Sequence, residues 1–250
     1  MADRGMAKQS KGRRIAMWSG PRNISTAMMR SFGSRRDTVC FDEPFYAWYL
    51  KKTMVEHPLR DEIIDHHISE WEAVVDQILG PIPGGKEFYF LKTQPQQMMP
   101  EVSRKWFSDV EHFFLIRDPE MIVRSYAASR TDFVAGELGI KMLREIFDEV
   151  TALNGKPPPV VSSEDILADP RKTLMRLCEH MDMPFDEAML SWKPGSHLED
   201  GIWGPHWYRS VLKSTGFGAP SNSPHPLPEK FEYMLPELQA HYEVMLKHKL

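Results

Sequence analysis

The sequence predicts an α/β protein with a parallel central sheet of about five strands flanked by helices. Five short apolar runs alternate with segments whose apolar residues recur at helical spacing. Such alternation is typical of a parallel sheet that helices cover on both faces. The run Phe88 to Leu91 is apolar throughout, as expected for a central strand that is buried on both faces. Because 250 residues suit one large domain, we predict a single domain over residues 15–250 after a disordered basic tail at residues 1–14.

Three strands are expected in the first half of the chain, at residues 15–19, 38–41 and 88–91. After the first strand, apolar residues recur at helical spacing at Ile24, Met28 and Phe32. After the second strand the chain turns at Pro44 and continues as another helix. A third helix is predicted over residues 61–79, where the apolar residues follow helical spacing and a run of Gly and Pro residues ends the pattern.

The second half of the chain repeats this pattern, with strands expected at residues 112–116 and 160–162. Asp118 is a good N-cap and Pro119 a good first residue for a helix that runs to about residue 130. Further helices are expected at about residues 137–153, after Asp169-Pro170, and at about residues 236–247. The stretch 191–228 is irregular and rich in Gly, Pro, Ser, Trp and His, and a loop of this length is usually functional or mobile.

Composition and charge argue against several classes of protein. The net charge of −4 argues against binding of nucleic acid or of an anionic membrane, so an anion site would be a local pocket. No apolar run approaches the ~18 residues that a membrane span needs. The two cysteines, Cys40 and Cys178, have no metal-binding or disulfide spacing, which favours a reducing compartment. We therefore predict a cytoplasmic protein without a membrane span.

The segment Ile15 to Arg30 is typical of an anion-binding site. A strand that turns sharply into a helix directs backbone N–H groups and the positive end of the helix dipole toward one point. Arg22 adds a permanent positive charge there, and Ser25 and Thr26 add hydroxyl donors. The sequence therefore predicts that this loop binds an anion.

Charged residues that follow other predicted strands should lie beside this loop. The carboxyl ends of parallel strands share one edge of the sheet, where ligands bind. This places Asp42, Glu43, Lys92 and Arg117 at the same edge. Two arginines, one lysine and a helix N-terminus suit a ligand with several anionic groups, such as a nucleotide.

The loop matches the nucleotide-binding P-loop only in outline. Its sequence, GPRNIST, lacks the Gly-Lys-Ser/Thr ending that brings a lysine to the phosphates and a hydroxyl to magnesium. Asp118 is better explained as a helix N-cap, and no other predicted strand ends convincingly in a metal-binding Asp. We therefore expect the anion to be held without a metal.

Two segments resemble the donor-binding motifs of PAPS-dependent sulfotransferases, and with them the bacterial "sulfotransferase family protein" group. WSGPRNIST is similar to the family's 5′-phosphosulfate loop. LIRDPEMIVRSY is similar to its 3′-phosphate segment, in which a serine lies eight residues after an arginine that ends a strand. The resemblance implies a P-loop NTPase-like sulfotransferase architecture. Where the family loop often carries Ser-Gly, this chain has Asn23-Ile24, and Ile24 is not expected to adopt the backbone conformations that glycine allows.

The resemblance also implies how PAPS (adenosine 3′-phosphate 5′-phosphosulfate) would bind as co-substrate, without a metal. Arg22 would stabilise the charge that develops on the leaving phosphate oxygen. Ser25 and Thr26 would hold the 5′-phosphate, and Arg117 and Ser125 the 3′-phosphate. The donor site implied in full comprises Gly20, Arg22, Asn23, Ser25, Thr26, Arg117, Ser125 and, as a late loop that closes over the 3′-phosphate, Lys213.

The same resemblance implies transfer of a sulfuryl group to a hydroxyl or amine of a small-molecule or sugar-like acceptor. Glu43, followed by Pro44, resembles the carboxylate base of carbohydrate-type and related bacterial sulfotransferases. Lys92 joins Arg22 and Glu43 in the catalytic set. Aromatic residues of the irregular stretch are candidates for an acceptor pocket, with core packing as the alternative: Trp203, Trp207 and Tyr208, together with His197 and His206. The acceptor itself and the oligomeric state are not readable from the sequence.

Other interpretations remain open at this stage. The chain could be a P-loop-type nucleotide kinase or phosphotransferase, or a non-catalytic nucleotide-binding member of the same fold. Arg117 could pair with a nearby carboxylate, Glu164 or Asp165. Glu43 could cap the helix that follows it or pair with Lys92, and Lys92 could be purely structural.

Overall fold

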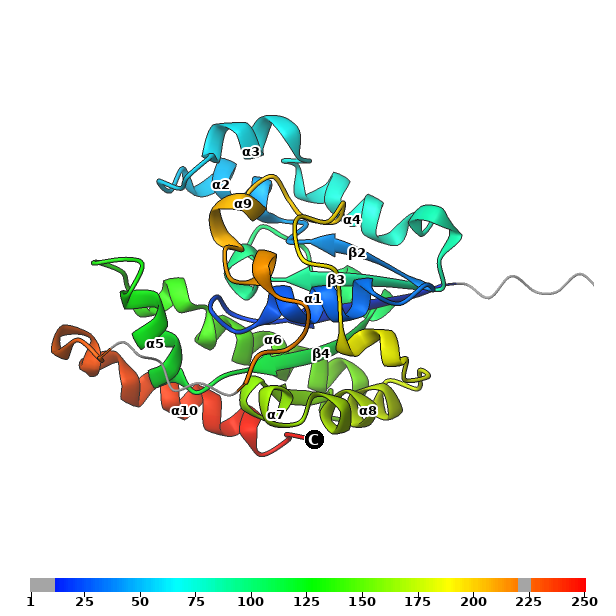
Figure 1. Ribbon diagram of the computed structural model, residues 1–250. Coiled ribbons are helices and arrows are strands. Elements are labelled where there is room, and N and C mark those ends of the chain that lie inside the picture. The colour runs from blue at the N-terminus through cyan, green and yellow to red at the C-terminus, as the bar shows by residue number, and fades with distance from the viewer. Residues whose placement is uncertain (1–11, 220–225) are drawn as a thin grey trace, which may run out of the picture.

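The computed structural model describes residues 12–219 and 226–250, which fold around one parallel sheet (Figure 1). The five strands are β1 (Arg13–Trp18), β2 (Thr38–Asp42), β3 (Phe88–Thr93), β4 (Glu111–Ile116) and β5 (Val160–Ser162). Their order in the sheet is β2-β3-β1-β4-β5, so the first strand lies at the centre. All paired strands are parallel. The predicted fold class, a parallel sheet of five strands flanked by helices, is confirmed.

Ten α-helices surround the sheet within the described residues. They are α1 (Ser25–Gly33), α2 (Tyr46–Thr53), α3 (Arg60–His66), α4 (Trp71–Leu79), α5 (Pro119–Ala127), α6 (Ile140–Asn154), α7 (Ser163–Ala168), α8 (Pro170–His180), α9 (Gly204–Trp207) and α10 (Leu235–Leu246). Among them, none combines the length and apolar character that crossing a membrane requires.

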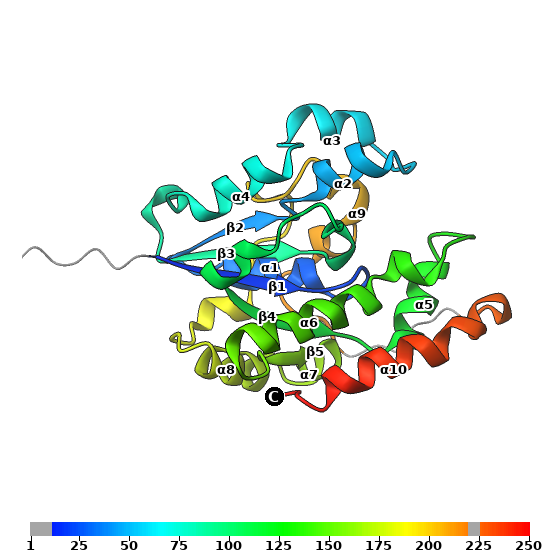
Figure 2. The ribbon, with the colours of Figure 1, turned by 180° about the vertical axis from the view of Figure 1, so that it is seen from behind.

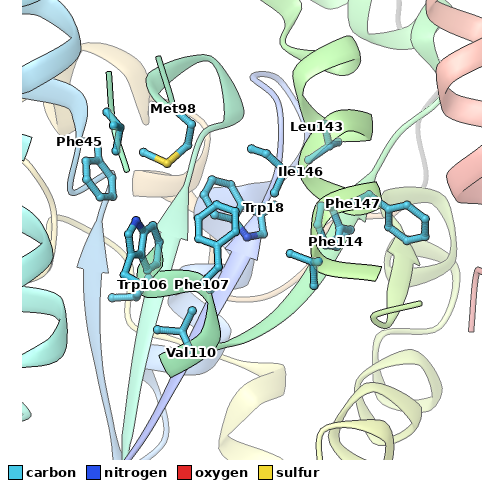
Figure 3. Packing of buried hydrophobic residues seen from close by; sticks show 14 of the residues in the cluster. Trp18, Phe45, Met98, Trp106, Phe107, Val110, Phe114, Leu143, Ile146 and Phe147 are labelled. Atoms are coloured by element: carbon cyan, nitrogen blue, oxygen red, sulfur yellow. The ribbon is translucent and has the colours of Figure 1, made fainter. Parts of the chain in front are cut away.

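The two faces of the sheet pack against different helices because side chains alternate along each strand. Ile15 and Met17 of β1 contact the cluster that contains residues of α1, α7 and α8, which lie in front in Figure 1. Ala16 and Trp18 contact the cluster on the opposite face, with residues of α4, α6 and α10 (Figure 2). Figure 3 shows the centre of this second cluster, where Trp18 lies beside Phe107. Burial on both faces holds the sheet in place and so sets the position of the edge at which its strands end.

The structure corrects the helix predicted over residues 61–79. It contains two helices, α3 and α4, because His67 and Glu70 have extended backbone conformations. The ring of His67 lies 4.9 Å from that of Trp203, measured between centroids. The apolar spacing is continuous through this region and so does not predict the break between the two helices, where the chain contacts a distant segment.

Several predicted boundaries also differ. Strand β1 begins at Arg13, inside the tail predicted for residues 1–14, and residues 1–11 of that tail lie outside the described part. Lys92 lies within β3 rather than after it, because the strand continues to Thr93. Helix α5 ends at Ala127, and α6 begins only at Ile140, after a 3-10 turn at Ala135–Leu138.

The stretch predicted as irregular over residues 191–228 connects the two halves of the molecule, although residues 220–225 lie outside the described part. Its short helix α9 lies between α1 and α2 (Figure 1). Arg30 of α1 forms a buried ion pair with Asp200, with 2.6 Å between Nη2 and Oδ2. The backbone N–H of Gly201 donates to Asp42 at the end of β2. This segment is thus anchored both to the first helix and to the second strand.

Candidate functional site

A cavity of about 370 Å³ opens at the carboxyl ends of the strands, where the sequence predicts the ligand. It is lined by the loop after β1, the end of β2, the end of β3 with the turn that follows it, the start of the β4–α5 unit, and the segment around α9. Of the predicted site residues, the lining includes Arg22, Asn23, Ser25, Thr26, Glu43, Lys92, Arg117 and Ser125. Lys213 is exposed and Gly20 is buried, and neither lines the cavity.

Three residues that line this cavity have left-handed backbone conformations that side chains disfavour. The φ angles are 61° at Arg22, 43° at Ile24 and 43° at Glu43. The expectation that Ile24 would not adopt a glycine-like conformation is wrong: it occupies the left-handed region as the residue before α1. A β-branched residue there is a rare backbone outlier, and such outliers gather at ligand sites that the surrounding structure enforces.

The two predicted anion segments meet at Arg22. Its Nε donates to Oγ of Ser125 at 3.0 Å, and Nη1 of Arg117 donates to the backbone oxygen of Arg22 at 2.6 Å. Burial lowers the pKa of both guanidinium groups from the usual value. The nearby carboxylate of Glu164 partly opposes this effect at Arg117. Arg22 is exposed and Arg117 is half-buried, so both guanidinium groups are accessible to an anionic ligand.

The N-terminus of α1 completes the anion site. No side chain caps this end of the helix, and Ser25 and Thr26 in its first turn line the cavity. Uncapped N–H groups and the positive end of the helix dipole favour a phosphate or sulfate group. The local chemistry therefore fits a ligand with an anionic end group.

Asn23 and Gly20 shape the loop. Nδ2 of Asn23 donates to the backbone oxygen of Leu115 on β4 at 2.6 Å, which ties the loop to the sheet. Gly20 lies against the 3-10 turn that ends at Leu138, so that a Cβ at this position would lie 2.6 Å from the oxygen of Leu138. Both residues therefore fix the position of Arg22.

We expect Gly20→Ala to lower the free energy of unfolding by about 1–3 kcal/mol, the usual cost of overpacking. The added methyl group meets a backbone oxygen, which is less free to move than a side chain. Gly136→Ala is the matched control, because a Cβ at Gly136 meets nothing within 4 Å. Urea denaturation measures both variants, and equal stability of the two would contradict this close packing.

A buried ion cluster forms the other end of the cavity. Nζ of Lys92 donates to Oε1 of Glu43 at 2.6 Å and to Oδ1 of Asp42 at 2.8 Å. Burial by itself lowers the pKa of Lys92, but the carboxylates of Asp42 and Glu43 outweigh burial and hold this pKa well above the usual value. Lys92 therefore stays protonated and cannot serve as a base at neutral pH.

Asp42 was expected at this edge of the sheet, but its contacts with Lys92 and Tyr208 were not predicted, and neither were the contacts of Gln94 and Gln97 with Glu43. Strand β2 ends in Asp42. Nothing in the sequence places Tyr208 beside β2, because 166 residues separate the two partners.

Aromatic side chains form the wall next to Glu43. Trp203, Trp207 and Tyr208 line the cavity, as expected, whereas His197 and His206 do not. Tyr46 of α2 is hydrogen-bonded to Nδ1 of His57, whose ring lies near that of Trp207. Burial, with a smaller effect of nearby positive charge, lowers the pKa of His57 to about 4, so this ring is neutral at physiological pH. This part of the cavity is thus lined by aromatic rings and an uncharged imidazole.

Sheet order, central first strand and phosphate-type loop together define a P-loop-like α/β protein. The chain belongs to the sulfotransferase domain family, whose model matches residues 13–247. The predicted membership of the sulfotransferase family and the predicted P-loop-like architecture are thereby confirmed. Among solved structures, a sulfotransferase from Alicyclobacillus acidocaldarius has a similar fold, with a TM-score of 0.55 at 10% identity, over 95% of this chain and 97% of that chain.

Two plant proteins are related in sequence over most of the chain. They are the branched-chain-amino-acid aminotransferase-like proteins 1 and 2 of Arabidopsis thaliana, which are 36% and 35% identical over 94% of this chain. The match covers 42% of each plant protein, so the chain spans about two fifths of their length.

Proposed function

We propose that this protein is a PAPS-dependent sulfotransferase that transfers a sulfuryl group to a hydroxyl or amine of a small, uncharged or sugar-like acceptor. The observation that carries the proposal is the contact of the two anion segments, in which Arg22 bonds Ser125 and Arg117 bonds the backbone of Arg22. A ligand with two separate anionic groups, such as a 3′,5′-bisphosphate, matches two linked cationic segments beside an open helix N-terminus. Two buried free thiols, Cys40 and Cys178, agree with the predicted cytoplasmic location.

At the donor end, Ser25, Thr26 and the first turn of α1 would bind the 5′-phosphate. Arg117 and Ser125 would bind the 3′-phosphate. Arg22 lies between the two and would stabilise the charge that collects on the departing phosphate oxygen. The positive charge of Arg22 is fixed, and its left-handed backbone conformation positions it toward the cavity rim.

At the acceptor end, Glu43 would act as the base. It would take the proton of the acceptor hydroxyl while the hydroxyl oxygen forms a bond to sulfur and the bond from sulfur to the phosphate oxygen breaks. The aromatic wall would hold the acceptor, and the carboxylates of Asp42 and Glu43 disfavour an acidic one. The ammonium group of Lys92 donates to three acceptors within the cluster. This favours an indirect role for Lys92 over direct contact with the donor.

Arg117→Ala tests the donor site. We expect adenosine 3′,5′-bisphosphate to bind the wild-type protein in the presence of EDTA and to bind the variant about 10- to 100-fold more weakly, because a charge-assisted hydrogen bond is lost. Isothermal titration calorimetry measures both. Arg144→Ala, which removes an arginine paired with Asp148 on α6, is the control. Binding of Mg-ATP but not of the bisphosphate would instead favour a kinase.

A further inference from the structure

We propose that Asp42 and Tyr208 are positioning residues that keep Lys92 on one oxygen of Glu43 and so leave the other oxygen, Oε2, to accept the proton. This inference rests on the proposed function, because it assigns a role within the same reaction. The residues come from three distant parts of the chain: the end of β2, the end of β3 and the residue directly after α9. Asp42 and Tyr208 both contact the ammonium group of Lys92, and Lys92 in turn contacts Glu43.

Lys92 has no hydrogen left for a substrate. Its three N–H groups match three acceptors, namely Oδ1 of Asp42 at 2.8 Å, Oε1 of Glu43 at 2.6 Å and the hydroxyl of Tyr208 at 3.0 Å. The side chain is 1% exposed. A direct contact with substrate would break one of these bonds inside a buried site, which is costly. Lys92 therefore acts on the reaction through Glu43.

The two oxygens of Glu43 differ in their surroundings. Oε1 accepts from Lys92 and from Nε2 of Gln94 at 2.7 Å, and these two donors occupy it. Oε2 accepts only from Nε2 of Gln97, at 2.9 Å, among the described residues. A carboxylate oxygen has two lone-pair directions, so Oε2 retains one that can accept a proton. The left-handed backbone at Glu43 is held by its own N–H, which donates to the backbone oxygen of Lys92 at 2.9 Å, and by its carbonyl oxygen, which accepts from the N–H of Tyr46.

Tyr208 determines how Lys92 divides its charge between the two carboxylates. Its hydroxyl donates to Oδ2 of Asp42 at 2.6 Å and accepts from Lys92 and from Nε1 of Trp203. Oδ2 of Asp42 also accepts from the backbone N–H of Gly201. These two donors satisfy Oδ2 of Asp42, so that Asp42 does not draw Lys92 away from Glu43. Removal of the hydroxyl makes Asp42 compete for Lys92.

This competition has a defined consequence for Glu43. Lys92 donates to both carboxylates, so Asp42 and Glu43 share one positive charge. If Lys92 moves toward Asp42, Oε1 of Glu43 loses this donor and the carboxylate is no longer held with Oε2 free for the acceptor.

Tyr208→Phe tests the inference by kinetics. We expect kcat to fall by up to about 100-fold, the loss that misplacement of a catalytic group can cause, with a smaller effect on KM for the acceptor. The affinity for adenosine 3′,5′-bisphosphate should not change. Tyr242→Phe is the control, because Tyr242 is another buried tyrosine and lies on α10, away from the cavity. A kcat equal to that of the wild type would overturn the inference.

A second measurement is independent of turnover. In protein labelled with 15N at lysine, the buried ammonium of Lys92 should give a slowly exchanging NMR signal, which Lys92→Met identifies by its loss. We expect Tyr208→Phe to abolish or shift this signal and Tyr242→Phe to retain it. An unchanged signal in Tyr208→Phe contradicts the network. If Tyr208→Phe shifts the signal but the wild-type protein does not transfer a sulfuryl group from PAPS, the network is supported and the proposed reaction is contradicted.

Discussion

Replacement of Glu43 by Gln is expected to lower kcat by about 10²- to 10⁴-fold, the range that a positioned general base contributes. The amide nearly preserves the volume of the side chain but cannot accept the proton, and its NH2 group would face either Gln97 or the pair Lys92 and Gln94. Because Glu43 lies at the acceptor end, the affinity for adenosine 3′,5′-bisphosphate should stay within a factor of about three. The measurement is steady-state transfer from PAPS, paired with calorimetry.

Glu145→Gln is the matched control for Glu43→Gln, because Glu145 is exposed on α6 and lies outside the cavity lining. It should leave both kcat and bisphosphate binding unchanged. A Glu43→Gln enzyme with wild-type kcat would exclude Glu43 as the base. The Tyr208 network would then hold a purely structural carboxylate.

Lys92→Met is expected to cost about 3–5 kcal/mol of unfolding free energy, as is usual when one partner of a buried ion pair is removed. Two carboxylates, Asp42 and Glu43, would remain in a site where both side chains are at most 7% exposed. Urea denaturation at pH 7 measures this change. Lys141 is exposed, so the same substitution there, Lys141→Met, should alter the free energy of unfolding far less.

The pH dependence of this stability has a clear sign. The pKa of Lys92 is raised in the folded protein, because the carboxylates of Asp42 and Glu43 outweigh the effect of burial. The stabilisation by Lys92 is therefore fully present below the unfolded pKa of about 10.4 and is lost as the pH rises through the folded value. The stability difference between wild type and Lys92→Met should thus persist at neutral pH and shrink in alkali. A constant difference up to strongly alkaline pH would contradict the charge-based account.

The sheet was predictable because its strands are marked by local composition. Runs such as Phe88 to Leu91 and His112 to Ile116 are apolar without alternation, and burial on both faces of the sheet requires this composition. The residues proposed to bind the donor also stand out in the sequence, since Arg22 lies in a turn and Arg117 precedes a well-capped helix. In each case the signal and the structure that it specifies lie within a few residues of each other.

The acceptor end of the site was less visible because its contacts are distant in sequence. Tyr208 lies in a segment without periodic pattern, and its position depends on the Arg30–Asp200 ion pair and on Gly201. The bend at His67 was missed for the same reason, since the contact with Trp203 opposes the local helical spacing. The error at Ile24 differs in kind: local preference disfavours its conformation, and the surrounding site imposes it.

A crystal structure with adenosine 3′,5′-bisphosphate tests the central claim most directly. The account predicts the 5′-phosphate at the N-terminus of α1, within hydrogen-bonding distance of Ser25 or Thr26, and the 3′-phosphate between Arg117 and Ser125. Glu43 should remain on Lys92, with Oε2 facing the space beside the 5′-phosphate. A bisphosphate bound elsewhere, or with its 3′-phosphate away from Arg117, would contradict the assignment of the cavity as a PAPS site.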